Sequence, residues 1–176
     1  LSYNKFYFYD YPIDNFYRVY NATEDLKNTY GYKRDSNGLE FGVKIPYKYD
    51  ISKDEYYRFS IGYRDTNVYE LTSTASNSVT QNSGKSKNFV LNSSYVKDNT
   101  NDNFNPTFGN FNKITVNLSP SEISDDDYIK VSTTNNYYFT LDNKSNSIFI
   151  LSKLGIASGL SKKIKTNDSF FLGGDF

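Results

Sequence analysis

Apolar and polar residues alternate along much of this chain with the period of two that is typical of β-strands. The alternation is clearest at residues 39–45 and 57–63, where every second side chain is apolar. Because successive side chains of a strand point to opposite faces, each segment carries four apolar side chains on one face. The pattern therefore predicts two strands, with a turn at residues 52–55 between them.

Eight other segments are predicted as strands, because they combine partial alternation with many aromatic and β-branched residues. They are residues 5–11, 16–20, 67–74, 87–92, 112–118, 128–133, 136–141 and 147–151. Clusters of Asn, Ser and Gly at 36–38, 82–84 and 142–146 predict turns between strands. Short strands at this spacing are typical of a sandwich or jelly roll.

Three stretches depart from the strand pattern. Ser119, Pro120 and Glu122 have the spacing of a capping box with proline in the first turn, which predicts one short helix near residues 119–127. The Asn-rich and Asp-rich residues 98–109 predict a long loop. Residues 72–88 contain few large apolar side chains, so we expect a solvated hairpin or a disordered excursion there.

The residues on either side of the turn at 52–55 suggest an architecture. Ile51 precedes the turn and Tyr57 follows six positions later. This spacing resembles the corner of fibronectin-III-like and carbohydrate-binding-module sandwiches. The resemblance implies that the tyrosine hydroxyl bonds to the backbone of the turn and fixes a corner between two sheets. We expect residues 1–176 to form one all-β domain, an antiparallel β-sandwich of jelly-roll or immunoglobulin/fibronectin-III-like type.

The composition removes several classes of chemistry. The 176 residues include no His, Cys, Met or Trp, but 18 Tyr and 14 Phe. Without His or Cys the chain lacks the usual ligands of zinc, haem and iron–sulfur clusters, and a His-based catalytic triad is impossible. We expect a protein that is not an enzyme and has no cofactor. A glycosidase that works with two carboxylates stays open as the enzymatic alternative.

Charge and hydropathy bear on partners and location. The 20 basic and 20 acidic residues balance, so no basic field is present to hold nucleic acid. No segment approaches the ~20 apolar residues of a transmembrane helix, and no leader-like apolar segment is present, so we expect no transmembrane segment. The chain begins at Leu1, which fits a mature product or an excised domain. We expect it to be secreted, or exposed on a cell surface or virion.

Two aromatic ends are the first candidate functional feature. Residues 3–12 are aromatic on both faces of a predicted strand, and residues 170–176 are also apolar. Such a strand can add to the sheet edge of a neighbouring subunit, although it can equally be the first strand of its own sheet. The predicted contacts to other copies of the chain or to structural subunits are Phe6, Tyr7, Phe8, Tyr9, Tyr11, Phe170, Phe171 and Phe176.

Tyrosines that lie near Asp and Asn are a second candidate site, for sugars. Sugar rings stack their C–H faces on aromatic rings while carboxylate and amide groups bond to the hydroxyls. The absence of Trp weakens this interpretation, and a core with its rim can also account for these tyrosines. The sugar-binding candidates are Tyr47, Tyr49, Tyr56, Tyr63, Asp65 and Asn67.

An acidic cluster and five glycosylation sequons complete the candidate sites. Glu122, Asp125 and Asp127 are oxygen ligands of the kind that Ca²⁺ prefers, and a solvated acidic run is the simpler interpretation. In a glycosylating host the sequons matter, although an Asn-rich chain also produces them by chance. The sequon residues are Asn21, Asn92, Asn117, Asn143 and Asn167.

Together these features predict a structural or adhesive subunit of an extracellular or virion-like assembly. A carbohydrate-binding module is the main alternative, with glycans as its partners. An amphipathic pore-forming hairpin in residues 67–91 is a further alternative.

Overall fold

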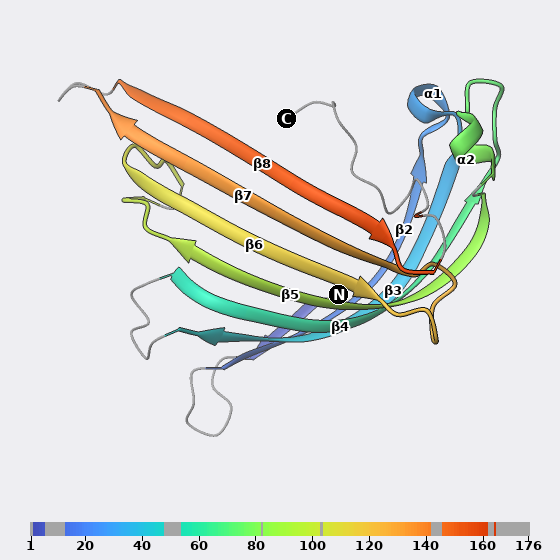
Figure 1. Ribbon diagram of the computed structural model, residues 1–176, viewed down its shortest axis with the longest axis horizontal. Helices are drawn as coiled ribbons and strands as arrows, with labels where there is room; N and C mark the ends of the chain where they lie inside the picture. The colour runs from blue at the N-terminus through green and yellow to red at the C-terminus, as the bar shows by residue number, and fades with distance from the viewer. Residues whose placement is uncertain are drawn as a thin grey trace.

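Eight strands form one antiparallel sheet in which each strand pairs with its neighbours in sequence (Figure 1). The computed structural model describes residues 2–5, 13–47, 54–81, 83–102, 104–141, 146–161 and 164, with the backbone alone for 2–5, 54 and 78. The strands are β1 (Ser2–Lys5), β2 (Asp14–Asp25), β3 (Lys33–Pro46), β4 (Asp54–Tyr69), β5 (Gly84–Asp98), β6 (Gly109–Ser119), β7 (Tyr128–Thr140) and β8 (Ser147–Gly159). Two short helices, α1 (Lys27–Tyr30) and α2 (Asn77–Gln81), follow β2 and β4.

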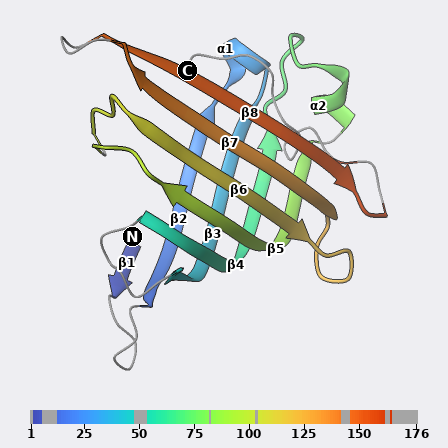
Figure 2. The ribbon, with the colours of Figure 1, turned by 60° about the vertical axis from the view of Figure 1, so that its left-hand side comes forward.

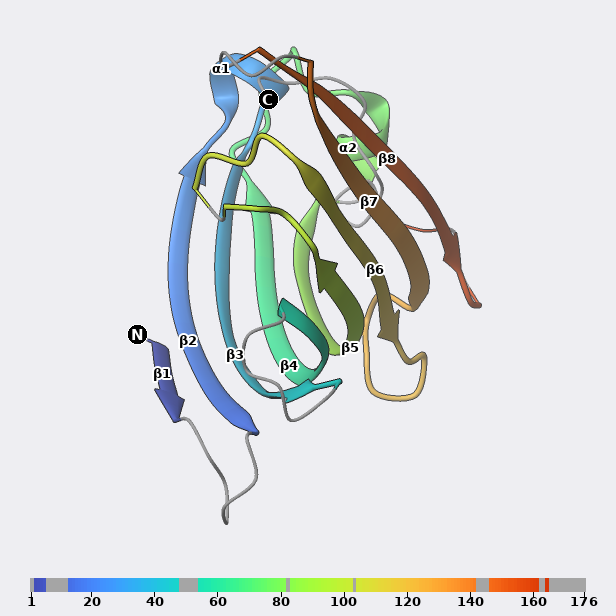
Figure 3. The same ribbon diagram turned by 90° about the vertical axis from the view of Figure 1, so that its left-hand side faces the viewer.

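The sheet is a single curved layer. Figures 2 and 3 show it bending from β2 round to β8, with α1 and α2 at the same end of the strands. In the part of the chain that the structure describes, no second sheet packs against it. The prediction of an antiparallel all-β chain is confirmed and the prediction of a sandwich is wrong, because the alternating apolar residues are not buried between two sheets. Leu39 is 56% exposed and Ile61 is 48% exposed.

Most predicted strands are found, and they are longer than predicted. Residues 39–45 lie within β3 and residues 57–63 within β4, while 128–133 and 136–141 belong to one continuous strand, β7. The strand predicted at 67–74 is wrong beyond Tyr69, where the chain enters the connection that contains α2.

The turn predicted at residues 36–38 is also wrong, because these residues lie inside β3. Gly38 pairs with Tyr20 of β2, and a Cβ built on Gly38 would lie 2.5 Å from the Tyr20 ring. The Tyr20 ring occupies the space that a side chain at position 38 would need. Only a glycine at this position leaves room for the ring against the strand backbone.

The predicted helix near 119–127 and the predicted sheet corner are not present. Ser119 ends β6, and its hydroxyl donates to the carbonyl oxygen of Asp126 at 2.6 Å, which closes a turn-containing loop in place of a helix cap. Tyr57 lies within β4 with its ring 5.2 Å from that of Tyr95 on the same sheet. A single sheet has no corner to fix, and Ile51 lies outside the described residues.

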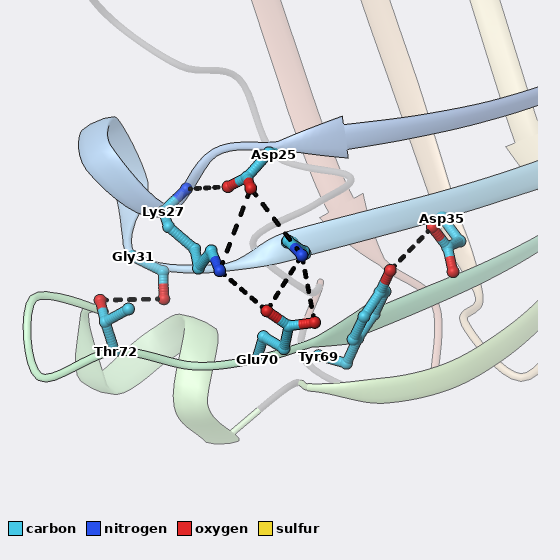
Figure 4. A network of polar contacts seen from close by, with 8 residues as sticks. Asp25, Lys27, Gly31, Asp35, Tyr69, Glu70 and Thr72 are labelled. Atoms are coloured by element: carbon cyan, nitrogen blue, oxygen red, sulfur yellow. Dashed lines mark hydrogen bonds and ion pairs between the residues drawn. The ribbon is translucent and has the colours of Figure 1, made fainter.

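A buried apolar cluster sits at the end of the sheet that carries the two helices. Tyr32, Val68 and Val79 are buried together, and Leu26 and Ala75 pack against them. Beside them Lys27 Nζ lies 2.8 Å from the Glu70 carboxylate, and Figure 4 shows this pair next to the Tyr69–Asp35 hydrogen bond. The cluster fixes the connections after β2 and β4 against each other.

Candidate functional site

The two faces of the sheet have opposite chemistry. The strand register places Tyr17, Phe41, Ile61, Leu91, Leu118 and Ile129 side by side in one row across β2 to β7. Because side chains alternate along each strand, apolar residues two and four positions away share that face. We call this set the apolar band. It consists of Tyr17, Val19, Leu39, Phe41, Val43, Ile45, Tyr57, Phe59, Ile61, Tyr63, Phe89, Leu91, Tyr95, Ile114, Val116, Leu118, Ile129, Val131, Tyr137, Phe139, Ile148, Ile150, Leu154 and Ile156.

The apolar band contains no charged residue, and the charges on its face lie beyond its two ends. On β3 to β5 these charged residues, assigned by alternation, are Lys33, Asp35, Glu55, Asp65, Lys85, Lys87 and Lys97. On β6 to β8 the same face carries no charge among the described residues. Such a face is uncharged in the middle and charged only toward the strand ends.

The side chains of the apolar band are widely exposed. Val19 is 62% exposed, Leu154 is 67% exposed and Ile156 is 76% exposed. Removing a large aliphatic side chain from water is favourable by about 1.5–3 kcal/mol. An exposed apolar surface that extends over seven strands exceeds the patches usual on monomeric soluble proteins. The face therefore requires an apolar covering.

The apolar band runs obliquely across the strands. The register connects Tyr17 on β2 with Ser158 on β8. On β2 the midpoint of the apolar band lies one residue after Tyr17. On β8 the band covers residues 148–156, and its midpoint lies six residues before Ser158. The band therefore shifts along the strands by about seven residues, at ~3.4 Å each, while it crosses six inter-strand steps of ~4.8 Å. The strands are consequently inclined to the normal of the band by about 40°.

The opposite face is concave and polar. A cavity of about 320 Å³ on it is lined by side chains from all the strands between β2 and β7, among them Arg18, Glu40, Arg64, Asn117 and Lys130. Figure 3 shows that the sheet bends to one side, and side chains on the inner side of a bend are crowded together. The polar face is the crowded one, since Ser60 and Ser94 are 9% exposed while Phe59 and Ile61 on the other face are 44% and 48% exposed. The apolar band therefore lies on the convex face.

Side chains on the concave face form a hydrogen-bonded network around Glu40. Its carboxylate lies 3.2 Å from the Arg18 guanidinium and accepts a 2.6 Å hydrogen bond from the Ser60 hydroxyl. Asn92 donates to the same hydroxyl at 3.1 Å, and Arg58 lies 3.9 Å from Glu40. The Glu40 side chain is only 14% exposed, so the network compensates a carboxylate that is largely removed from water.

Aromatic rings lie flat against glycines on the same face. A Cβ on Gly42 would lie 2.2 Å from the Phe16 ring, just as one on Gly38 would meet Tyr20. The Arg58 guanidinium in turn sits 4.0 Å above the Phe16 ring. The rings of Phe16 and Tyr20 therefore occupy the space over these two glycines, and Tyr20 also lines the concave cavity beside its polar residues.

Cations outnumber carboxylates among the concave-facing side chains of β2 to β8. By alternation the eight cations are Arg18, Arg34, Lys44, Arg58, Arg64, Lys113, Lys130 and Lys153. The four carboxylates whose side chains are described are Asp14, Glu24, Glu40 and Asp98, and all but Glu40 lie within two residues of a strand end. The middle of the concave face is therefore basic.

At the helix-bearing end, Glu70, which follows β4, is bonded to lysines of α1 and β3. It accepts hydrogen bonds from Lys27 at 2.8 Å and from Lys33 at 3.2 Å. These two bonds, that from Lys27 first, hold the pKa of Glu70 below its usual value. The carboxylate is exposed, so water screens the pairing.

The predicted sugar-binding residues do not gather in one place. Tyr63, Asp65 and Asn67 lie on the convex face of β4, whereas alternation puts Tyr56 on the concave face, where Lys44 Nζ lies 4.1 Å from its ring centre. Tyr47 follows β3 and its ring lies 6.2 Å from that of Tyr57. Tyr49 lies outside the described residues.

The acidic residues proposed for Ca²⁺ are engaged by other parts of the chain. Asp125 accepts from the Lys87 amide at 2.8 Å, and Asp127 accepts from the Ser161 amide at 2.8 Å. Glu122 is exposed. Within the described ranges, no three acidic residues form a group that would hold a metal ion. The neighbouring Asp126 is buried and accepts from Ser86 and Asn88.

The other predicted sites fall in several places. Of the sequon residues, Asn21 is exposed on the convex face of β2, while Asn92 and Asn117 line the concave cavity. Asn143 and Asn167 lie outside the described residues, as do all eight aromatic residues predicted as partner contacts. Those eight are Phe6, Tyr7, Phe8, Tyr9, Tyr11, Phe170, Phe171 and Phe176.

Helices in the described part of the chain are too short and too polar to cross a membrane.

Comparison with known protein families identifies the chain. The Omp85 superfamily domain matches residues 1–176. The chain belongs to the Omp85 superfamily. No curated protein matches it.

A solved structure with the same fold agrees with this membership. BamA from Haemophilus ducreyi lacking POTRA domains 1–3 superposes with a TM-score of 0.74 at 23% sequence identity. The match covers 98% of this chain and 35% of the BamA chain, so this chain spans about a third of the length of that chain. At this identity the likeness shows the fold, which again is not a jelly-roll or immunoglobulin-like sandwich.

Membership of the Omp85 superfamily corrects the functional predictions. The predicted structural or adhesive subunit is wrong, and so is the carbohydrate-binding module. The predicted partners, other copies of the chain and neighbouring structural subunits, are wrong for the same reason. The location is the outer membrane, which agrees with the predicted cell-surface association but not with a secreted or virion-exposed protein.

Proposed function

We propose that this chain forms part of a membrane-embedded β-barrel wall, with the apolar band against lipid and the concave face toward water. The observation that carries the proposal is the uncharged convex band. The strands are inclined to the normal of this band by about 40°, which matches the tilt of about 35–45° that strands adopt in transmembrane barrels.

Strand length and backbone pairing support the same arrangement. A tilted strand needs about 9–11 residues to cross a bilayer, and β2 to β8 contain 11 to 16 residues each. Backbone groups inside a bilayer must be paired, and each strand from β2 to β7 has a partner on both sides. The outer edges of β1 and β8 then pair with further strands of the barrel.

A fluorescence experiment tests which face meets lipid. The chain contains no Trp, so a single Trp reports on one position. In vesicles whose acyl chains carry bromine, a quencher, we expect the fluorescence of Ile61→Trp to be quenched strongly. The matched variant Ser132→Trp, on the concave face of β7, should be quenched little. Equal quenching of the two, or quenching of Ser132→Trp alone, would overturn the proposal.

For the activity, we propose that the barrel inserts polypeptides into the outer membrane or transports them across it. Membership of the Omp85 superfamily and the BamA-like fold support this activity. The partners are then unfolded outer-membrane polypeptides and other proteins of a membrane-embedded complex.

A reconstitution experiment tests the activity. Proteoliposomes that contain the full protein should fold a urea-denatured outer-membrane β-protein faster than empty liposomes do. Liposomes that contain an unrelated barrel of similar size control for lipid disturbance. Equal rates in the two protein-containing samples would contradict the proposed activity and leave the lipid-facing band as a separate result.

A further inference from the structure

The apolar band is not equally apolar on all of its strands. On β3 and β4 every convex-facing position of residues 39–45 and 57–63 is apolar. On β7 the alternation of side chains places Thr133 and Asn135 within the band, and on β8 it places Ser152 there. The convex face is therefore more polar over β7 and β8 than over β3 and β4.

The strand register brings these polar side chains together with one from β6. Asn112 pairs with Asn135, and Asn135 pairs with Ser152, so the three lie side by side across β6 to β8. The Asn135 amide donates a hydrogen bond of 3.2 Å to the hydroxyl of Thr133, two positions along the same strand. We call these four residues, Asn112, Thr133, Asn135 and Ser152, the polar row.

The polar row lies at the middle of the apolar band. On β7 the band covers residues 129–139, and its midpoint falls between Thr133 and Asn135. On β8 it covers residues 148–156, and its midpoint is Ser152. The inference rests on the proposed function: with the band against lipid, the polar row lies near the centre of the bilayer.

Much of the hydrogen-bonding capacity of the polar row is not used within the described part of the chain. An asparagine side chain has two N–H donors and an acceptor oxygen, and Asn135 uses one donor, toward Thr133. The side chains of Asn112 and Ser152 form no hydrogen bond there. All four residues are partly exposed, so a partner can reach them. Acyl chains offer no hydrogen bond, and lipid headgroups lie at the bilayer surface.

We propose that the polar row binds a transmembrane helix of another protein through a polar side chain at the middle of that helix. Side chains of Asn, Ser and Thr form such hydrogen bonds between transmembrane segments. The row crosses two inter-strand steps of ~4.8 Å, or about 10 Å, which is close to the diameter of about 10–12 Å of an α-helix. Apolar residues of the band flank the row, so the rest of the helix surface at the contact is apolar.

Ser93 on β5 provides a contrast within the same face. Its side chain also belongs to the convex face, but its cross-strand partners are Phe59 on β4 and Val116 on β6. A single hydroxyl among apolar neighbours does not form a row. Ser93 is therefore the matched control for Ser152.

A model helix tests the proposal. The probe is a leucine-rich transmembrane peptide with one asparagine at its middle and a nitroxide beside it, which quenches Trp at close range. The reference peptide has leucine in place of the asparagine. In vesicles that contain the full protein, we expect Leu154→Trp to be half quenched at a peptide-to-lipid ratio at least about threefold lower with the asparagine peptide than with the reference. Ile61→Trp, on β4, should respond equally to both peptides.

Removing the polar row should remove the preference. In the Leu154→Trp protein, Asn135→Leu should bring the two peptides to nearly equal quenching, and Ser152→Ala should reduce the difference between them. Ser93→Ala should leave the difference unchanged. Asn135→Leu and Ser152→Ala are measured separately, so that a failure of one to fold leaves the other.

Three outcomes would overturn the proposal. They are equal quenching of Leu154→Trp by the two peptides, the same preference at Ile61→Trp, and a preference that survives both Asn135→Leu and Ser152→Ala.

These results separate the inference from the function on which it rests. Absence of bromolipid quenching at Ile61→Trp contradicts the membrane-embedded wall whatever the peptides show. Strong bromolipid quenching there, together with no preference for the asparagine peptide at Leu154→Trp, contradicts the helix-binding row alone.

Discussion

The convex and concave faces are built from the same strands and share every backbone hydrogen bond, yet they suit different surroundings. On β4, Phe59 and Ile61 are 44% and 48% exposed on the convex face, while Ser60 between them is 9% exposed and bonds to Glu40. The apolar side chains are thus the outer ones and the polar side chains are the packed ones. This is the reverse of a water-soluble sheet, and it shows that the interior of this wall is held by polar contacts.

The largest expected effect comes from placing a charge on each face in turn. Ile61→Arg puts a guanidinium in the middle of the apolar band, where it should lower the free energy of unfolding in phospholipid vesicles by about 2–4 kcal/mol. Ser132→Arg, on the concave face, should change it by less than about 1 kcal/mol. Denaturant titration in vesicles measures both. Equal losses would show that the two faces have the same surroundings.

A second comparison uses two glycines of the concave face. In Gly42→Val the new Cβ meets the Phe16 ring at 2.2 Å and a backbone oxygen of Phe59 at 2.7 Å. We expect a loss of about 1–3 kcal/mol of unfolding free energy, because the ring must leave its place. Gly62→Val meets nothing closer than 3.3 Å and should cost less than about 1 kcal/mol. Denaturant titration in vesicles measures both losses of unfolding free energy. A larger loss for Gly62→Val than for Gly42→Val would contradict the prediction.

The polar network supplies the third comparison. Glu40→Gln leaves Arg18 and Arg58 without their carboxylate and should lower the unfolding free energy by about 1 kcal/mol, since both arginines remain partly in water. Glu24→Gln removes an exposed pairing with Arg34 near the strand ends and should cost less than about 0.5 kcal/mol. If both substitutions have the same effect, the concave network adds nothing beyond a surface ion pair.

The smallest effect is a pH dependence at the helix-bearing end. The pKa of Glu70 is lowered by hydrogen bonds from Lys27 and Lys33, so its stabilising contribution is present above the usual glutamate value. It is lost as the pH falls through the lowered pKa. The protection factors of the amides in residues 70–76, that is, their hydrogen exchange corrected for the intrinsic pH dependence of the rate, should therefore fall below about pH 4.5. Glu70→Gln should weaken this response, and an unchanged response would mean that other groups control it.

The alternation of the sequence predicts the strands because it records which side chains share a face. The alternation does not show what covers the apolar face, because lipid and a second sheet would each remove Phe41 or Ile61 from water. The sandwich prediction fails at this step. If the wall is membrane-embedded as proposed, the ~20-residue criterion for membrane segments does not detect it, because a strand with one polar face never presents such a run.

Glycines and polar clusters depend on partners that are distant in the sequence. The cluster at residues 36–38 predicts a turn, because the Tyr20 ring that explains Gly38 is 18 positions away and only the register brings the two together. The cluster of Tyr32, Val68 and Val79 likewise depends on contacts between distant segments. Part of the concave cavity can be predicted from the sequence, because Arg64 alternates with the apolar residues of β4. The sequon residues Asn92 and Asn117 also line it.

The pairing of every strand with its neighbours in sequence has a consequence for how the wall is made. Each contact between strands joins segments that follow one another along the chain. Forming each contact therefore closes only one short loop and loses little conformational entropy. The sheet can therefore grow one hairpin at a time, each new hairpin covering the open edge left by the last. The direction of synthesis can then serve as the direction of assembly, and the growing edge is the part that most needs a partner.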